Sequence, residues 1–162
     1  MSLKAVYYSA VSYCLITDIM MWDCGRPCEQ INGVSKEDLV KVYDYEFDTF
    51  GLIAYNKFDK ELVISFRGTN GVDIPNWSMN FKSEKVPYED VEGAQIHAGF
   101  YMGWKKLRED TLAKVADMIW NYQPKKILVT GHSMGGALAT LAAIEIKLHS
   151  GFMGDINLYT YG

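Results

Sequence analysis

The stretch that decides the fold is KILVTGHSMGGALATLAA, which occupies residues 126–143. It begins with an apolar run, Ile127 to Val129, of the kind found in strands that are buried on both faces of a parallel sheet. From Met134 onward, small and apolar residues indicate a helix that can pack closely on such a sheet. Between them lies Gly131-His132-Ser133-Met134-Gly135, which fits the pattern G-x-S-x-G on a tight strand-to-helix turn.

The residue types of this pattern have a physical reason. Only a very sharp turn pushes the Ser133 hydroxyl clear of the backbone, and the serine must then adopt a strained conformation. Residues two before and two after it come close together, so Gly131 and Gly135 avoid a collision of side chains. The helix N-terminus directs free N–H groups at the place where an oxyanion would form. We therefore interpret Ser133 as a nucleophile. Gly131, His132 and Gly135 then belong to the nucleophile elbow, the sharp strand-to-helix turn that carries the serine.

A glycine-rich turn of a nucleotide-binding fold is the alternative interpretation of this stretch. Such a turn requires a second spacing of glycines, G-x-G-x-x-G, or a lysine directly after the glycines. Residues 131–143 contain neither feature. The sequence context therefore favours the hydrolase interpretation.

Length and composition limit the classes of function. The chain has 162 residues, of which 49% are hydrophobic and 14% aromatic, so it can form one globular domain with a core. A net charge of −4 argues against nucleic acid as a partner, because phosphate binding needs a basic face. No apolar stretch predicts a transmembrane helix. The first residues lack the features of a secretory signal, which leaves a processed, secreted or lumenal protein and a cytoplasmic one as alternatives.

Hydrophobic patterning divides the chain into elements. We expect a helix over residues 3–20 and a loop-like segment over 22–38 in which Ser35 and Asp38 cap a short turn. Strands are expected at 40–47, 50–55, 62–66, 127–129 and 156–161, and helices at 99–122 and 134–149. The segment 68–83 is irregular in pattern. Strands and helices alternate in the second half, which predicts parallel strands and an α/β class for a single domain over residues 1–162.

Three cysteines are present: Cys14, Cys24 and Cys28. Cys24 and Cys28 flank Gly25-Arg26-Pro27, a turn-forming stretch, so they could close a small disulfide loop. A reduced pair, or half of a metal site, is the alternative. We expect no metal and no cofactor.

Five ordered blocks of this sequence resemble the class 3 lipases, a family that includes fungal triacylglycerol lipases and feruloyl esterases. The blocks are Ile64–Thr69, Asn76-Trp77, His97–Phe100, Val129–Ala137 and Leu158–Gly162. The resemblance implies an α/β-hydrolase fold, with a mostly parallel central sheet and flanking helices. It also implies hydrolysis of carboxylic esters of lipids at a lipid–water interface, by a serine esterase or lipase.

The resemblance also implies roles for individual positions. Ser133 is the expected nucleophile. Thr69, through its backbone N–H and its hydroxyl, and Met134, through its backbone N–H, are the expected oxyanion-hole residues. Residues 70–81 match the interfacial lid, whose apolar side chains include Val72, Ile74 and Trp77. His97 matches a histidine that supports the floor of the site. Cys14 matches a cysteine that, in fungal members, pairs with one near the C-terminus.

A serine triad in this fold needs an acid and then a histidine after the nucleophile. His149 lies roughly 24 Å along the helix from Ser133 at 1.5 Å per residue, too far for a hydrogen bond. Asp155 precedes the last strand and so falls at the wrong edge of the sheet. We therefore expect residues 1–162 to be an incomplete hydrolase domain, with C-terminal strands and helices missing, and to be inactive alone. The strand at 156–161 would then be an unprotected apolar edge.

Two other functions are compatible with the sequence. The first is a non-catalytic lipid-binding or interaction module that has kept the fold and lost the triad. The second is a feruloyl-type esterase that acts on soluble esters, for which a polar and fixed lid would be expected. The apolar character of residues 70–81 favours lipid substrates.

Overall fold

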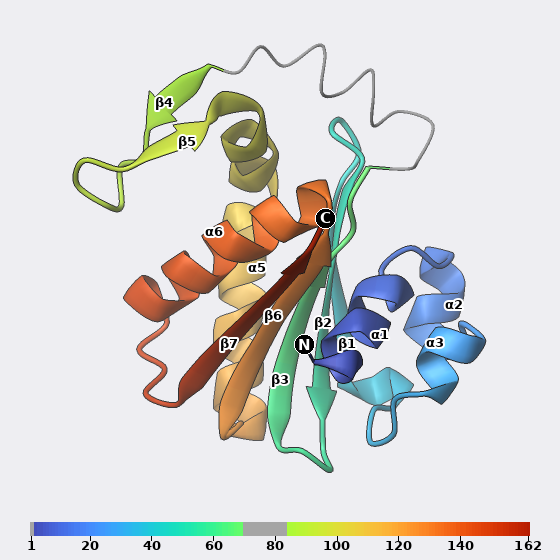
Figure 1. Cartoon of the computed structure of the whole chain (residues 1–162). Coiled ribbons are helices and arrows are strands. Elements are labelled where there is room, and N and C mark those ends of the chain that lie inside the picture. Colours follow the sequence, from blue (N-terminus) through green and yellow to red (C-terminus); the bar gives the residue numbers. More distant parts are fainter. Residues whose placement is uncertain (1, 70–83) are drawn as a thin grey trace.

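The computed structural model describes residues 2–69 and 84–162, and its centre is a mixed sheet in the order β1-β2-β3-β6-β7 (Figure 1). The antiparallel part consists of β1 (Leu39–Asp44), β2 (Thr49–Asn56) and β3 (Glu61–Phe66). β6 (Lys126–His132) and β7 (Asp155–Tyr161) continue the sheet in parallel with β3. The α/β class is confirmed. The sheet is parallel only in its second half, because short turns join neighbouring strands only when these are antiparallel.

Helices cover both faces of this sheet (Figure 1). One face carries α1 (Leu3–Val11), α2 (Ile16–Met21) and α3 (Arg26–Glu29), and the other carries α5 (Ala98–Tyr122) and α6 (Met134–His149). In β3, Leu62 and Ile64 belong to the core with α5 and α6, whereas Val63 belongs to the core with α1. Successive side chains of a strand point to opposite faces, so a strand covered on both sides is apolar at every position.

The first helix is shorter than the sequence predicts. The sequence predicts one continuous helix to residue 20 from the spacing of its apolar residues, but α1 ends at Val11 and α2 starts at Ile16. Ser12 follows α1, and its hydroxyl donates to the Ser9 carbonyl over 2.7 Å, which competes with the helical pattern. Leu15 is extended, with φ −60° and ψ 134°. The prediction of one helix over 3–20 is therefore wrong.

Two further segments differ from the expectation. The strand predicted to reach Phe47 ends at Asp44, because the Asp44 carboxylate accepts the Phe47 N–H over 2.9 Å and forms a turn. The segment 22–38 contains α3 and a 3₁₀ turn, η1 (Lys36–Asp38). At that turn the Ser35 hydroxyl donates to the Asp38 carboxylate over 2.6 Å, in place of a bond to the backbone.

The Cys24–Cys28 disulfide is present and closes the loop around α3, as one of the sequence alternatives predicts. Cys14 is a free, half-buried thiol whose sulfur donates to the Cys24 carbonyl over 3.7 Å. Burial, assisted by the charge of Asp18, raises the pKa of this thiol. Cys14 is therefore a poor nucleophile in this environment.

A second, small sheet follows residue 84. β4 (Lys85–Pro87) and β5 (Gln95–His97) form an antiparallel hairpin that leads directly into α5. Strands of three residues carry too little periodicity to be detected in sequence, and the hairpin was not expected. Figure 1 shows it beyond the beginning of α5 and above α6.

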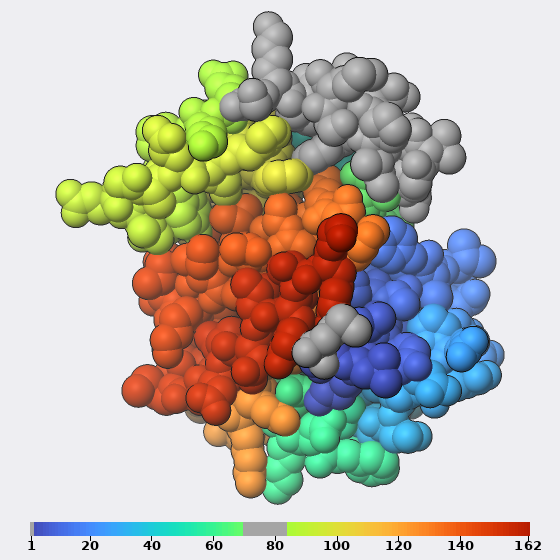
Figure 2. Space-filling view, viewed as in Figure 1, coloured from blue at the N-terminus to red at the C-terminus, as the bar shows by residue number. Residues whose placement is uncertain are grey.

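β7 is the outermost strand of the described sheet. Figure 2 shows its residues at the surface beside the helices of the N-terminal segment. Leu158 is 39% and Tyr159 36% exposed, so apolar side chains of β7 face solvent as expected. None of the described helices is long and apolar enough to span a bilayer.

Candidate active site

Ser133 lies between the end of β6 and the start of α6 with φ 55° and ψ −128°. A positive φ is unusual for a residue with a side chain, and such strain persists only where the surroundings enforce it. The Ser133 N–H donates to the Tyr161 carbonyl over 2.8 Å, and its own carbonyl accepts from Gly136 over 2.9 Å. These two bonds hold the serine in a tight turn at the carboxyl edge of the parallel strands.

The two glycines of the elbow are required by close backbone contacts. A Cβ on Gly131 would stand less than 3.0 Å from the carbonyl oxygen of Gly135. A Cβ on Gly135 would stand less than 3.0 Å from the carbonyl oxygen of Phe66, at the end of β3. Any larger residue at either position would force strand and helix apart. The first contact brings together the residues that the sequence analysis expected to meet.

The end of β3 passes directly beside the elbow. In the parallel register Phe66 is opposite Gly131. A Cβ on Gly68 would lie 3.2 Å from the Ser133 Cβ, and the Thr69 hydroxyl contacts the Met134 sulfur at 3.7 Å. Thr69, Met134 and Ser133 are therefore neighbours, although Thr69 is far from the other two in sequence.

Met134 is the first residue of α6 and is buried. The first N–H groups of a helix have no partner within the helix and lie at the positive end of its dipole. The Met134 N–H belongs to this set. A negative charge that forms next to the Ser133 hydroxyl would be stabilised from this direction.

Arg67 fixes the backbone that precedes Gly68. Its N–H donates to the Phe50 carbonyl over 3.0 Å, and its guanidinium donates to the Asp48 carboxylate over 2.6 Å. Burial opposes ionisation of Asp48, but hydrogen bonds from Tyr43 and Arg67 outweigh it and hold the pKa of Asp48 below its usual value. The carboxylate thus remains charged at neutral pH and keeps Arg67 in place.

The three histidines have other positions. His132 is exposed, and its Nδ1 lies 2.8 Å from the Tyr13 hydroxyl. His149 lies at the far end of α6, where its Nε2 is 3.3 Å from Asp90. His97 caps α5, with its Nδ1 accepting the Gly99 N–H over 3.2 Å. Within residues 2–69 and 84–162, no histidine is hydrogen-bonded to Ser133.

The role of His97 as support for the floor of the site stays a prediction. The expected lid residues Val72, Ile74 and Trp77 lie outside the described residues.

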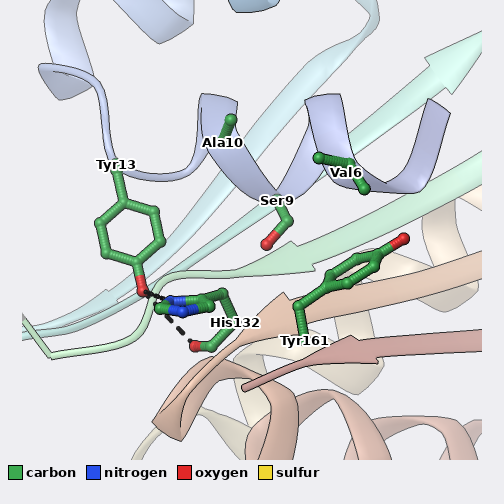
Figure 3. A pocket seen from close by; sticks show the side chains of 6 residues that line it. All are labelled: Val6, Ser9, Ala10, Tyr13, His132 and Tyr161. Carbon is green, nitrogen blue, oxygen red and sulfur yellow. Dashed lines mark hydrogen bonds between the residues drawn. The ribbon is translucent and has the colours of Figure 1, made fainter. Parts of the chain in front are cut away.

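Tyr13 is a site residue that the sequence analysis missed. It follows α1 and lines a small pocket of about 210 Å³ between α1 and the ends of β6 and β7 (Figure 3). The lining residues are Val6, Ser9, Ala10, Tyr13, His132 and Tyr161. No local pattern marks Tyr13, because its partners are Gly68 and His132.

A second missed cluster surrounds Glu145, which is on α6 and 0% exposed. Its carboxylate accepts from Trp104 and Arg108, each over 2.5 Å, and from the Tyr88 hydroxyl over 3.2 Å. Asp90 and His149 lie close enough to complete a metal-ligand set with it. Arg108 already supplies a positive charge to the Glu145 carboxylate. We therefore interpret the cluster as an ion-pair network that joins α5, α6 and the β4–β5 hairpin.

The fold and this site together define the chain as an α/β hydrolase: parallel strands, a strained serine after β6, and helices on both faces. Comparison with known proteins identifies the family. Residues 63–162 match the model of the class 3 lipases, and the chain belongs to that family.

Individual relatives show the extent of the similarity. A lipase from Rhizomucor miehei is 31% identical over 98% of this chain, and a secreted mono- and diacylglycerol lipase from Fusarium solani is 35% identical over 80%. The crystal structure of a lipase from Rhizopus microsporus var. chinensis superposes on 97% of the chain with a TM-score of 0.85 and 26% identity. The chain covers 43% and 38% of the first two proteins and 54% of the third.

Proposed function

We propose that the protein containing this chain hydrolyses carboxylic esters of lipids through an acyl-enzyme on Ser133. The observation that carries the proposal is the position of the Ser133 hydroxyl. Ser133 lies on a strained turn at the start of α6, and the side chain of the next residue, Met134, contacts Thr69. Backbone N–H groups of Thr69 and Met134 are the proposed donors to the oxyanion. Losing one such donor typically costs about 2.7 to 4 kcal/mol of transition-state stabilisation.

In the proposed reaction the Ser133 oxygen attacks the ester carbonyl carbon while a general base accepts the serine proton. The tetrahedral intermediate collapses, its C–O bond to the alcohol breaks, and the alcohol leaves with that proton. Water then attacks the acyl-serine, which releases a carboxylic acid and restores the hydroxyl. We assign the base and its acid partner to sequence outside residues 1–162, because the described histidines have other contacts.

The relatives support lipid esters as the substrate class, since their names specify triacylglyceride, monoacylglycerol and diacylglycerol. The apolar residues of the expected lid, Val72, Ile74 and Trp77, agree with an interface between water and lipid. A feruloyl-type esterase and a non-catalytic lipid-binding protein are the competing functions. Hydrolysis rates on emulsified and on dissolved triglyceride separate the two esterases: a lipase is faster on the emulsion.

The experiment that tests the chemistry uses the protein produced from its natural gene. A fluorophosphonate probe should label Ser133, as shown by mass spectrometry of the labelled peptide, and Ser133→Ala should abolish both labelling and hydrolysis of p-nitrophenyl butyrate. Ser150→Ala is the control, because Ser150 follows the far end of α6. An unlabelled wild-type protein would end the proposal in favour of a non-catalytic module.

Residues 1–162 expressed alone should show no turnover above background. Removing the base from a serine triad costs on the order of 10⁶ in kcat. Hydrolysis by this polypeptide that Ser133→Ala abolishes would contradict the assignment of the base to other sequence.

Secretion is the proposed location. Two relatives are named as secreted lipases, and the Cys24–Cys28 disulfide suits an oxidising compartment. A peptide that contains the intact Cys24–Cys28 disulfide should be found by mass spectrometry, under non-reducing conditions, of the protein recovered from its natural source. Recovery of free Cys24 and Cys28 would favour the cytoplasm instead.

A further inference from the structure

The hydroxyl of Tyr13 connects three parts of the chain at the elbow. It accepts the Gly68 N–H over 3.1 Å, at the end of β3. It also lies 2.8 Å from His132 Nδ1 and 3.4 Å from the His132 carbonyl, directly before the nucleophile (Figure 3). The rings of Tyr13 and His132 contact edge to face, with centroids 5.8 Å apart. A single oxygen atom thus links the loop that follows α1, the backbone before Thr69 and the backbone before Ser133.

Gly68 has a special place in this arrangement. A Cβ at position 68 would collide with the Tyr13 hydroxyl and with the His132 carbonyl, so only glycine fits between them. Glycine is the residue whose backbone dihedral angles are least restricted by its own atoms. The orientation of the peptide between Gly68 and Thr69 is therefore determined by what holds Gly68 in place.

Besides the bonds of Arg67, contacts from two sides supply that restraint. Gly135 packs on the backbone of Phe66 and Arg67, which fixes the chain before Gly68 from the side of α6. The Tyr13 hydroxyl fixes the Gly68 N–H from the side of α1. Burial raises the pKa of the Tyr13 phenol, although the Gly68 N–H and the charge of Arg67 oppose the shift. The phenol therefore keeps its proton at neutral pH and can accept from Gly68 while it donates to His132.

We propose that Tyr13 is a positioning residue for the oxyanion-binding backbone: its hydroxyl fixes Gly68 and thereby aims the N–H of Thr69. This inference rests on the proposed function of Ser133 and Thr69. Tyr13 acts through Gly68 and has no contact with the reacting atoms in this assignment. An oxyanion donor is effective only when it is already aligned before charge develops, so a loosened Gly68 lowers the rate of the chemical step.

The test is Tyr13→Phe in the protein produced from its natural gene, with p-nitrophenyl butyrate as substrate. Loss of one net hydrogen bond corresponds to a fall of about threefold to tenfold in kcat, with little change in KM. n-Butylboronic acid, which forms a tetrahedral adduct with the serine, should bind more weakly by a similar factor. The amide of Gly68 should exchange its hydrogen with solvent faster in the variant, since its partner has gone.

Tyr8→Phe is the matched control. Tyr8 is on α1, and its hydroxyl accepts from Asn56 over 3.1 Å, on β2 and away from the elbow. This control removes an equivalent bond between α1 and the sheet, so it should lower stability without changing kcat, boronate affinity or the Gly68 exchange rate. Equal losses of kcat in both variants would show that Tyr13 merely anchors α1 and would overturn the proposal, as would an unchanged kcat and exchange rate in Tyr13→Phe.

The outcomes also separate this proposal from the proposed function. If the wild type neither hydrolyses the ester nor reacts with a fluorophosphonate, the function of Ser133 fails, and the role of Tyr13 in aiming an oxyanion donor fails with it. If the wild type is active and Ser133→Ala is not, while Tyr13→Phe matches wild type in kcat and boronate affinity, only the present inference is overturned.

Discussion

The carbonyl oxygen of Phe66 occupies the space that a side chain on Gly135 would need. Phe66 ends β3 and Gly135 lies in the first turn of α6, so the helix after Ser133 packs directly on the strand that leads to Thr69. This backbone contact thus limits how closely Ser133 and the backbone before Thr69 can approach each other. Any atom added at position 135 must increase the distance between them.

Gly135→Ala should therefore destabilise the protein and reduce ester hydrolysis. Overpacking of this kind typically costs about 1 to 3 kcal/mol, measured here as the free energy of unfolding in urea. Gly103→Ala on α5 is the control, because its Cβ would have ordinary contacts at 3.8 Å from Leu138 and Thr49. Alanine in a helix interior stabilises by roughly 0.5 to 1 kcal/mol relative to glycine. A Gly135→Ala protein as stable and active as wild type would contradict the contact.

Glu145→Gln should destabilise the junction of α5, α6 and the β4–β5 hairpin. The amide can no longer accept from Arg108 and Trp104 as a carboxylate does, and its NH₂ group has no acceptor among those donors. Hydrogen bonds to a charged group contribute about 1.5 to 3 kcal/mol each, and we expect a total loss of that order. Thermal unfolding measures it. Glu109→Gln, exposed on α5, should change stability by less than about 0.5 kcal/mol, and equal effects of the two variants would refute the network.

Removing the disulfide by the double substitution Cys24→Ser and Cys28→Ser should lower stability only moderately. The bond closes a loop of sequence separation 4, and chain entropy for so short a loop gives about 2 kcal/mol. Denaturant unfolding of the double variant against wild type measures the difference. The Cys14→Ser variant provides the comparison, since that thiol forms no disulfide in the described chain. If the free energy of unfolding falls by much more than the value for a short loop, the disulfide stabilises a larger part of the structure than the loop around α3.

The Asp48 carboxylate should contribute to the acid sensitivity of the protein. Its pKa is lower in the folded protein than in the unfolded chain, because bonds from Tyr43 and Arg67 outweigh burial. The folded state thus binds fewer protons, and the stabilisation is present above the unfolded pKa, about 3.9, and is lost as pH falls through the lower folded value. Unfolding measured between about pH 2.5 and 6 should lose part of its pH dependence in Asp48→Asn. Asp110→Asn, an exposed partner of Lys114, is the control, and identical pH curves for Asp48→Asn and wild type would refute the assignment.

The elements around Ser133 were predicted well because their signals are local. The apolar run in β6 and the small residues of α6 define both elements, and α6 has the predicted bounds, Met134–His149. Errors occurred where a side chain competes with the backbone. The apolar spacing of residues 3–20 contains no sign that the Ser12 hydroxyl bonds back to Ser9. In the same way, the alternation of large side chains continues to Phe47, although the Asp44 carboxylate accepts the Phe47 N–H and ends the strand in a turn.

The candidate site likewise contains residues that a local motif predicts and residues that only the fold brings together. Gly131, Ser133 and Gly135 lie within five residues of one motif, so their spacing reveals the turn. Thr69 could be assigned only from a family resemblance, and its assigned role stays a prediction. Tyr13 was missed because its partners, Gly68 and His132, are separated from it by 55 and 119 residues.

The sequence by itself determined the strand, the tight turn and the helix around Ser133, because steric limits on glycine and serine and the hydrophobic run act over a few neighbouring residues. The tertiary structure alone decided which backbone segment lies beside that serine and which contacts hold that segment in place. Gly68 lies between Tyr13 and His132 because α1 ends early and β3 is paired with β6, and neither fact is encoded in any short stretch of the chain. Packing between distant segments has no periodicity to be read, and so it becomes visible only when the chain is folded.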